Sequence, residues 1–152
     1  MKKLKFLLAA IFISAGLFAQ TDFSGTWELN NSESKLGERS FAPNEIVIVQ
    51  NGNEMSVESH MERQGQEINR TNKYTLDGKE SVNPGFRDSE VKSTAVWSDD
   101  KKSLKITSKF SMQNGDMTMV TVYKMNGASL VVESSSSSSF GDRSETRVYN
   151  KK

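Results

Sequence analysis

The sequence predicts an all-β protein, an antiparallel up-and-down meander β-barrel of eight to ten strands with a short helix or loop after the first strand. Two observations predict this fold. From Gly25 onward, apolar and polar residues alternate with the period of two that is typical of half-buried strands, and helical periodicity is almost absent. Gly, Asn and Asp interrupt this alternation at short intervals, and these residues tolerate the positive φ angles of tight hairpin turns. Sequential hairpins form a meander, which minimises its exposed edges by curling into a barrel.

Each strand is expected between two turn signals. The signals are Asn51-Gly52-Asn53, Gln64-Gly65-Gln66, Asp77-Gly78, Pro84-Gly85, Asp99-Asp100-Lys101-Lys102, Asn114-Gly115-Asp116, Asn126-Gly127 and Gly141-Asp142. Between them we expect strands at 24–30, 45–50, 54–62, 66–76, 79–83, 89–98, 103–112, 116–125, 129–139 and 143–150. The one long connection, Asn31 to Asn44, has room for a short helix beginning near Ser32. A two-sheet sandwich is the alternative architecture, but it normally needs longer crossovers.

The first 19 residues have the pattern of a cleaved secretory signal peptide. Three lysines lie within Met1 to Lys5, and an apolar stretch runs from Phe6 to Ala19. We expect cleavage before Gln20, so that residues 20–152 form one exported domain, in the periplasm or outside the cell. The alternative is an uncleaved N-terminal anchor. We expect a monomer without a stable membrane anchor.

Charge and composition exclude several functions. Without Lys2, Lys3 and Lys5, the mature chain has 17 basic residues against 19 acidic ones, which disfavours a nucleic-acid-binding protein. Cysteine is absent, which excludes disulfides, thiolate metal sites and cysteine nucleophiles. No metal, nucleotide or nucleophile motif is found, so we expect no cofactor and no enzyme activity.

The inward faces of the strands combine apolar and polar side chains. In the strand at 103–112, one face carries Leu104, Ile106, Ser108, Phe110 and Met112, and the other carries lysines and hydroxyls. The other faces that we place inward contain Met55, Val57, Ser59 and Met61; Ile68, Arg70, Asn72, Tyr74 and Leu76; Val91, Ser93, Ala95 and Trp97; and Met117, Met119, Thr121, Tyr123 and Met125. Because unpaired buried polar groups cost about 1 to 3 kcal/mol each, we expect a cavity with water or an amphipathic ligand rather than a dry core.

Two compositional features bear on this cavity. Six serines, Ser134 to Ser139, occupy a position where the hairpin spacing predicts a strand with hydroxyls on both faces, although a flexible linker has the same composition. Inward-facing methionines could adapt to varied apolar ligands or could simply fill gaps in the core.

Segments at both ends of the mature chain resemble the lipocalins and the intracellular fatty-acid-binding proteins of the calycin superfamily. Phe23-Ser24-Gly25-Thr26-Trp27-Glu28-Leu29 is similar to their Gly-x-Trp opening. Leu130-Val131-Val132-Glu133 followed by Glu145-Thr146-Arg147-Val148-Tyr149-Asn150-Lys151 looks like the last hairpin of fatty-acid-binding proteins. The resemblance implies an exported bacterial lipocalin-like barrel. It also implies that Arg147 and Tyr149 bind the ligand's anionic group and that Trp27 closes one end of the barrel.

These observations together predict a non-catalytic binding protein for a small hydrophobic or amphipathic ligand, such as a fatty acid or a similar lipid. The expected ligand-contacting residues are Arg147, Tyr149, Arg70, Tyr74, Phe110, Met119, Tyr123 and Ser136. Alternation alone allows either face of the last strand to point inward. If Arg147 does, Glu145 could neutralise it without any ligand. The alternative functions are an extracytoplasmic protein-interaction or inhibitor scaffold and, more remotely, an enzyme with Glu145 as general acid or base.

Overall fold

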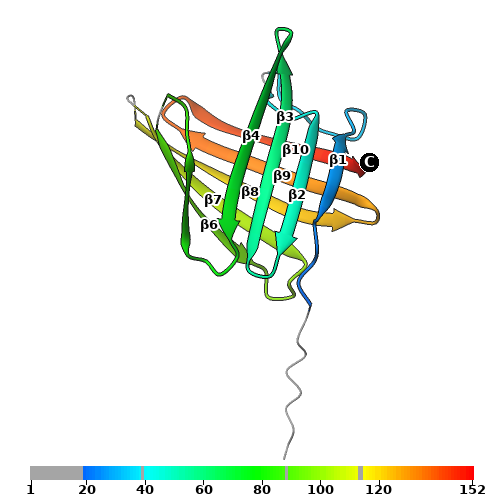
Figure 1. Ribbon diagram of the computed structural model, residues 1–152. Helices are drawn as coiled ribbons and strands as arrows, with labels where there is room; N and C mark the ends of the chain where they lie inside the picture. The colour runs from blue at the N-terminus through cyan, green and yellow to red at the C-terminus, as the bar shows by residue number, and fades with distance from the viewer. Residues whose placement is uncertain (1–18, 39, 88, 113–114) are drawn as a thin grey trace, which may run out of the picture.

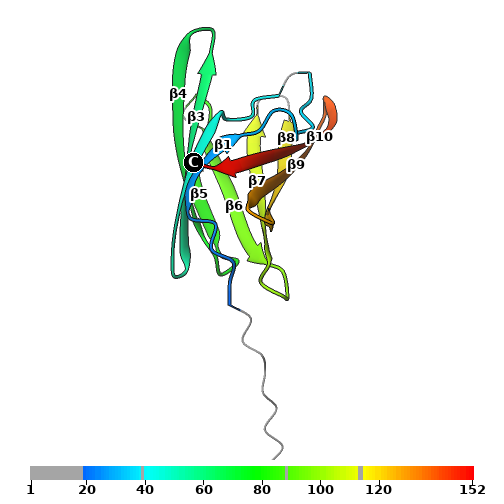
Figure 2. The same cartoon turned by 90° about the vertical axis from the view of Figure 1, so that its right-hand side faces the viewer.

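The structure is a computed structural model that describes residues 19–38, 40–87, 89–112 and 115–152. Within these residues, ten antiparallel strands form one sheet that curls into a nearly closed barrel (Figure 1 and Figure 2). The strands are β1 (Gly25–Leu29), β2 (Glu45–Asn51), β3 (Glu54–Arg63), β4 (Gln66–Thr75), β5 (Glu80–Pro84), β6 (Glu90–Trp97), β7 (Ser103–Met112), β8 (Gly115–Asn126), β9 (Ser129–Ser138) and β10 (Gly141–Lys151). The predicted all-β up-and-down barrel is therefore confirmed.

The predicted leader, residues 1–19, lies almost entirely outside the described residues. The part of the chain that the structure describes contains no helix with the length and hydropathy needed to cross a bilayer.

The two ends of the domain meet in the sheet, because β1 pairs with both β2 and β10. Trp27 of β1 lies opposite Ile46 on one side and Lys151 on the other. The remaining strand pairs are sequence neighbours joined by short turns, as the turn signals predict. In the turn between β8 and β9, Gly127 adopts a φ of +59°, which a residue without a Cβ reaches at little cost.

The backbone ladder has one opening, between β4 and β5, which are the two edges of the sheet. We call this opening the β4–β5 seam, and side chains of β5 bridge it. The buried amide of Asn83 accepts a hydrogen bond from Lys73 N at 2.7 Å and donates one to Lys73 O at 2.9 Å, so it replaces a backbone partner. Ser81 Oγ accepts a hydrogen bond from Thr75 N at 3.0 Å. Because buried backbone groups need partners, these two side chains satisfy the edge of β4 where no strand does.

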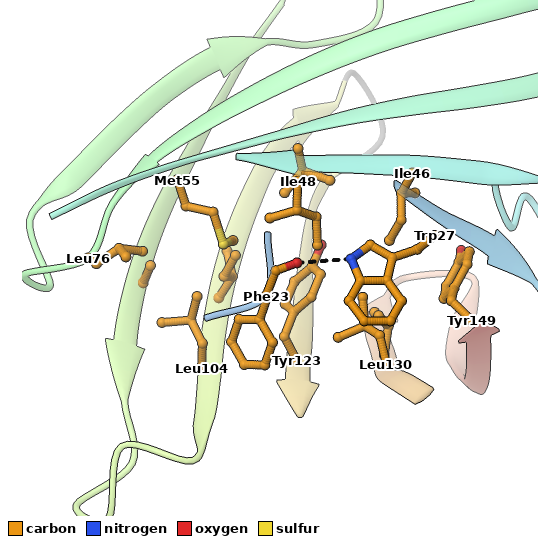
Figure 3. Packing of buried hydrophobic residues seen from close by; sticks show 14 of the residues in the cluster. Phe23, Trp27, Ile46, Ile48, Met55, Leu76, Leu104, Tyr123, Leu130 and Tyr149 are labelled. Carbon is orange, nitrogen blue, oxygen red and sulfur yellow. Dashed lines mark hydrogen bonds between the residues drawn. The ribbon is translucent and has the colours of Figure 1, made fainter. Parts of the chain in front are cut away.

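The hydrophobic core follows the predicted alternation (Figure 3). The buried residues of β6 are Val91, Ser93, Ala95 and Trp97, and those of β7 are Leu104, Ile106 and Ser108. Ser93 and Ser108 lie opposite each other and share a hydrogen bond of 2.8 Å between their hydroxyls. These two hydroxyls therefore satisfy each other without the water or ligand that we expected. The side chain of Met112, which the alternation also places inward, lies outside the described residues.

The segment before β1 fills one end of the barrel. Phe23 is fully buried and stacks on Trp97, with ring centroids 5.7 Å apart and planes inclined by 12°. The buried Trp27 donates its indole N–H to Phe23 O at 2.9 Å (Figure 3). Gln50 Oε1 accepts a hydrogen bond from Phe23 N at 3.2 Å and ties the segment to β2. This end of the interior is packed with side chains.

The connection between β1 and β2 is a loop, which is one of the two forms that the sequence predicts. Ser34 N donates to Asn30 O at 3.1 Å and closes a single turn. The turn does not continue as a helix because Lys35 pairs with Thr146 of β10 through two backbone hydrogen bonds of 2.7 and 3.0 Å. In Figure 2 the described parts of this loop lie at the upper end of the barrel, whereas the segment that precedes β1 enters at the lower end.

Candidate functional site

A cavity of about 630 Å³ lies between residues Gly37, Glu38, Ser40 and Phe41 of the β1–β2 loop and the walls of β8, β9 and β10. It is distant from the packed end, because its β8 residues lie near the start of that strand, whereas Tyr123, which contacts Phe23, lies near its finish. Among the described residues, the lining combines two thioethers, one phenyl ring, five serines, two carboxylates and two guanidinium groups. The residues are Gly37, Glu38, Ser40, Phe41, Met117, Met119, Ser134, Ser135, Ser136, Arg143, Ser144, Glu145 and Arg147.

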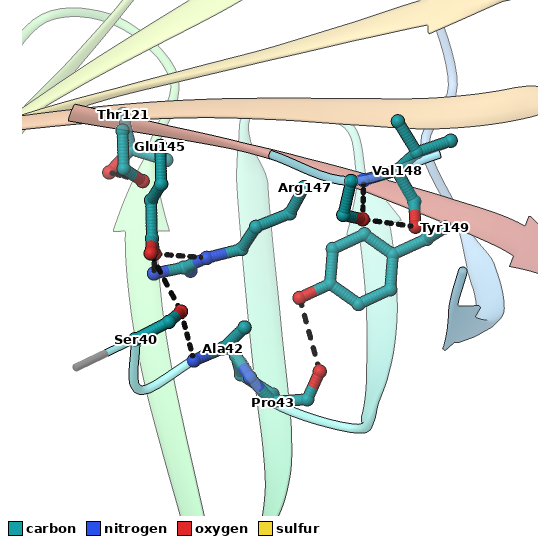
Figure 4. A network of polar contacts seen from close by, with 10 residues as sticks. Ser40, Ala42, Pro43, Thr121, Glu145, Arg147, Val148 and Tyr149 are labelled. Atoms are coloured by element: carbon teal, nitrogen blue, oxygen red, sulfur yellow. Dashed lines mark hydrogen bonds and ion pairs between the residues drawn. The ribbon is translucent and has the colours of Figure 1, made fainter. Parts of the chain in front are cut away.

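An ion pair stands in the wall of this cavity (Figure 4). Arg147 Nε donates to Glu145 Oε1 at 2.6 Å, and Arg147 Nη2 donates to the same oxygen. Both side chains point inward from β10 and are only 18% and 15% exposed, respectively. The second carboxylate oxygen, Oε2, accepts a hydrogen bond from Ser40 Oγ at 2.6 Å. The last strand therefore has the Glu145, Arg147 and Tyr149 face inward, and Glu145 supplies the anion for Arg147.

β10 also holds the loop that covers the cavity, through one side chain and one backbone group. Tyr149 OH donates to Pro43 O at 3.3 Å, and Val148 N donates to Ser34 Oγ at 2.9 Å (Figure 4). Burial raises the pKa of the Tyr149 phenol well above its usual value, although the nearby Arg147 charge opposes that rise. The phenol is therefore neutral and available as a donor, and its proton is directed to the loop.

The serine-rich segment forms the middle of the cavity wall. Ser134 to Ser138 belong to β9, so the strand interpretation is correct for that part of the run. Ser134 is buried, Ser136 is half-buried, and Ser135 and Ser137 are exposed, which gives the alternation expected of a strand. Ser134 Oγ lies 3.5 Å from Thr121 Oγ1 on β8. Because serine side chains are small, this part of β9 leaves the space that the cavity occupies.

The residues that the sequence predicts as ligand contacts do not all meet in one place. Arg147, Met119 and Ser136 line the cavity. Tyr123 and Tyr149 belong to the hydrophobic core, and Tyr74 packs against it. Burial raises the pKa of Tyr123 to about 12.

Two further predicted ligand contacts, Arg70 and Phe110, lie outside the cavity lining, and so does Trp27, which the resemblance places at the closed end of the barrel. Arg70 donates a hydrogen bond to Pro84 O across the β4–β5 seam. Phe110 is half-buried on β7, opposite Met117, and is not part of the cavity lining. Trp27 lies in the packed core beside Phe23.

Sequence reasoning missed the part of the site that comes from the β1–β2 loop. Glu38, Ser40 and Phe41 line the cavity, but they lie in an irregular segment without periodicity. Arg143 was missed as well. The alternation predicts on which face of the strand a residue lies, but it does not predict how far that residue lies from the end of the barrel. Among the described residues, no three His, Asp or Glu side chains are grouped as a metal site would require.

Comparison with known proteins gives matches at the level of structure. No family model matches the chain, and no curated protein sequence matches it. A zebrafish ileal bile acid-binding protein complexed with cholic acid superposes with a TM-score of 0.60 and 21% identity, over 86% of this chain and 98% of that one. A secretory abundant heat soluble protein from Ramazzottius varieornatus gives a TM-score of 0.61 and 14% identity, over 89% and 98%.

A third similar structure is the apo form of lipid binding protein 8 from Caenorhabditis elegans, with a TM-score of 0.59 and 12% identity, over 86% of this chain and 95% of that one. Each of these proteins is matched over nearly its whole length. The chain therefore shares the antiparallel barrel fold of these proteins.

Proposed function

We propose that this calycin-type barrel is an exported, non-catalytic protein that holds one small hydrophobic or amphipathic ligand. The observation that carries the proposal is the cavity beside β8, β9 and β10. Its volume of about 630 Å³ lies within the range of roughly 300–1,000 Å³ that small-molecule sites occupy. Similar barrels include one that is named for lipid binding and one that was solved with cholic acid, which supports the same ligand class.

The lining supports an amphipathic molecule. Met117, Met119 and Phe41 provide an apolar wall, and flexible thioethers adapt to ligands of different shape. At roughly 25 cal/mol per Å², each 100 Å² of apolar ligand surface that is buried contributes about 2.5 kcal/mol. The serines of β9 and the Glu145–Arg147 pair would orient the polar end of the ligand by hydrogen bonds.

Export rests on the leader sequence, with its lysines followed by an apolar stretch that ends at Ala19.

The hydrogen bonds of the Glu145 carboxylate favour a binding role over general acid–base catalysis. Both of its carboxylate oxygens accept hydrogen bonds from side chains of this chain, Arg147 and Ser40.

Displacement of an uncharged fluorescent amphiphile by a panel of lipids tests this proposal. The blocking variant is Ser136→Phe, which places a ring in the cavity, and the matched control is Ser137→Phe, on the exposed face of the same strand. We expect wild type and Ser137→Phe to bind the probe and Ser136→Phe to lose at least about tenfold in affinity. Equal binding by both variants, with equal thermal stability, would place the ligand outside the cavity.

A protein-interaction scaffold is the second candidate, and exposed aromatic residues favour it. Phe41, Phe86 and Phe140 lie in three different connections and are 58%, 77% and 73% exposed. These three connections lie at the same end of the up-and-down barrel, and exposed apolar side chains at one end can mark protein contacts. A stoichiometric protein partner that is retained by wild type and lost when all three are changed to Ser, together with an empty cavity, would favour this function.

A further inference from the structure

We infer that the ligand is an uncharged amphiphile with a hydroxyl-bearing head, and that Glu145 is the residue that discriminates against carboxylate ligands. This inference rests on the proposed binding function and narrows it. It departs from the terminal resemblance, which implies that Arg147 and Tyr149 hold an anion supplied by the ligand.

The first step is that Arg147 already has its counter-ion. Two of its N–H groups, at Nε and Nη2, donate to one oxygen of Glu145. Strands alternate their side chains, so Glu145 and Arg147 necessarily share the inner face of β10. Since both side chains are more than four-fifths buried, solvent screens their charges only weakly. A ligand carboxylate placed at Arg147 would therefore lie close to the negative charge of Glu145.

The second step is that Glu145 is fixed where it is. Ser40 Oγ donates to its other oxygen at 2.6 Å and links it to the loop that covers the cavity. The same hydroxyl accepts a hydrogen bond from Ala42 N at 3.2 Å, so the link is part of the loop structure (Figure 4). An anionic head could displace Glu145 only by breaking this contact and leaving a second carboxylate in a half-enclosed site, which is unfavourable.

The third step is that the lining suits a neutral hydroxylated group. Among the lining residues that the structure describes, the two carboxylates of Glu38 and Glu145 are matched by the two guanidinium groups of Arg143 and Arg147. Arg147 has five N–H donors and uses two for Glu145, which leaves donors for a ligand oxygen. Serine hydroxyls in the wall both donate and accept. An alcohol or a glyceride head can use all of these groups without adding charge.

The experiment compares ligands that differ only in the head group. A saturated fatty acid, the alcohol of the same chain length and the corresponding monoacylglycerol compete with one uncharged fluorescent amphiphile at pH 7, where an ordinary carboxyl is ionised. We expect wild type to bind the alcohol and the monoacylglycerol at least about tenfold more tightly than the acid. The variant Glu145→Gln, which keeps the shape and frees Arg147, should bind the acid at least about tenfold more tightly than wild type does, with the alcohol changed by less than about threefold.

The matched control is Glu38→Gln, which removes an exposed carboxylate from the same cavity and should leave the preference unchanged. Acid binding by wild type that equals or exceeds alcohol binding would overturn the inference and leave the proposed function standing. Equal shifts in Glu145→Gln and Glu38→Gln would also overturn it, because the effect would then be one of net charge. If no member of the series and no probe binds, the proposed function fails as well. If Glu145→Gln folds poorly, the affinity of wild type for the alcohol relative to the acid still tests the inference.

Discussion

Phe23 is the residue on which the packed end of the barrel most depends, although it lies outside every strand. It is fully buried between the rings of Trp97 and Tyr123, and its carbonyl accepts the indole N–H of Trp27. Removing the ring would leave a cavity that surrounding strands cannot collapse to fill, because each is held by ladder bonds on both sides.

We expect Phe23→Ala to lower the free energy of unfolding by about 3–5 kcal/mol, measured by urea denaturation. Phe86→Ala is the matched control, since Phe86 is 77% exposed in the β5–β6 connection, and it should change the same quantity by no more than about 0.5 kcal/mol. Similar losses in the two variants would show that Phe23 is not part of the core.

The three tyrosines of the chain share one prediction, because burial raises the pKa of each of their phenols, that of Tyr123 to about 12. The folded protein keeps protons that the unfolded chain releases near the usual value of 10. The free energy of unfolding should therefore decrease as the pH rises above 10 and through the folded-state values.

Phenolate absorbance measures this directly. We expect the titration midpoint to lie near 10 in denaturant and clearly higher in the native protein, with the stability loss in the same pH range. A tyrosine that ionises near 10 while circular dichroism still reports the folded barrel would contradict the burial of these rings.

Single residues also show how far the sequence could be interpreted. Alternation placed Trp97 and Leu104 in the core correctly, because a strand with one buried face has only two possible orientations. The same rule could not identify Phe23, which precedes the first strand. It also could not decide between a ligand and Glu145 as the partner of Arg147, since that choice depends on side-chain rotamers and on Ser40 from a distant loop.

At the level of elements, the strands were predictable because nearly every one is bounded by a turn with its own chemistry. The seam was not predictable in the same way. The meander pattern implies that β4 and β5 are neighbours, but only the structure shows that side chains replace their ladder. The β1–β2 loop has no periodic pattern, so the part of the cavity wall that this loop forms could not be predicted.

The seam leads to a prediction about Asn83, whose side chain is 5% exposed and bonds both backbone groups of Lys73. In Asn83→Ala those two groups lose their partners, and we expect a loss of about 1–3 kcal/mol in the free energy of unfolding. Hydrogen exchange of the Lys73 amide should accelerate by a larger factor than exchange in β8 or β9.

The neighbouring variant Val82→Ala provides the control, because Val82 is 54% exposed on the same strand. It should leave the exchange rate of the Lys73 amide nearly unchanged. Unchanged exchange in Asn83→Ala would mean that the seam is held by other contacts, such as the one between Arg70 and Pro84.

At the scale of the whole molecule, the barrel is divided into two ends with different roles. Aromatic and aliphatic side chains around Phe23 fill one end and supply stability, as Figure 3 shows. Small serine side chains on β9 and the ion pair of β10 leave space at the other end, beneath the β1–β2 loop. The apolar surface buried at the packed end stabilises the domain, which has no disulfides. The other end can therefore contain a cavity.

Native mass spectrometry of the protein, purified from its own cells, tests the central claim that this cavity holds a small amphipathic molecule. We expect wild type and Ser137→Phe to carry one small molecule per chain and Ser136→Phe to carry none. Organic extraction of the adduct should then yield an uncharged hydroxylated lipid. A bare chain mass for wild type that persists after incubation with the lipid panel would contradict the account.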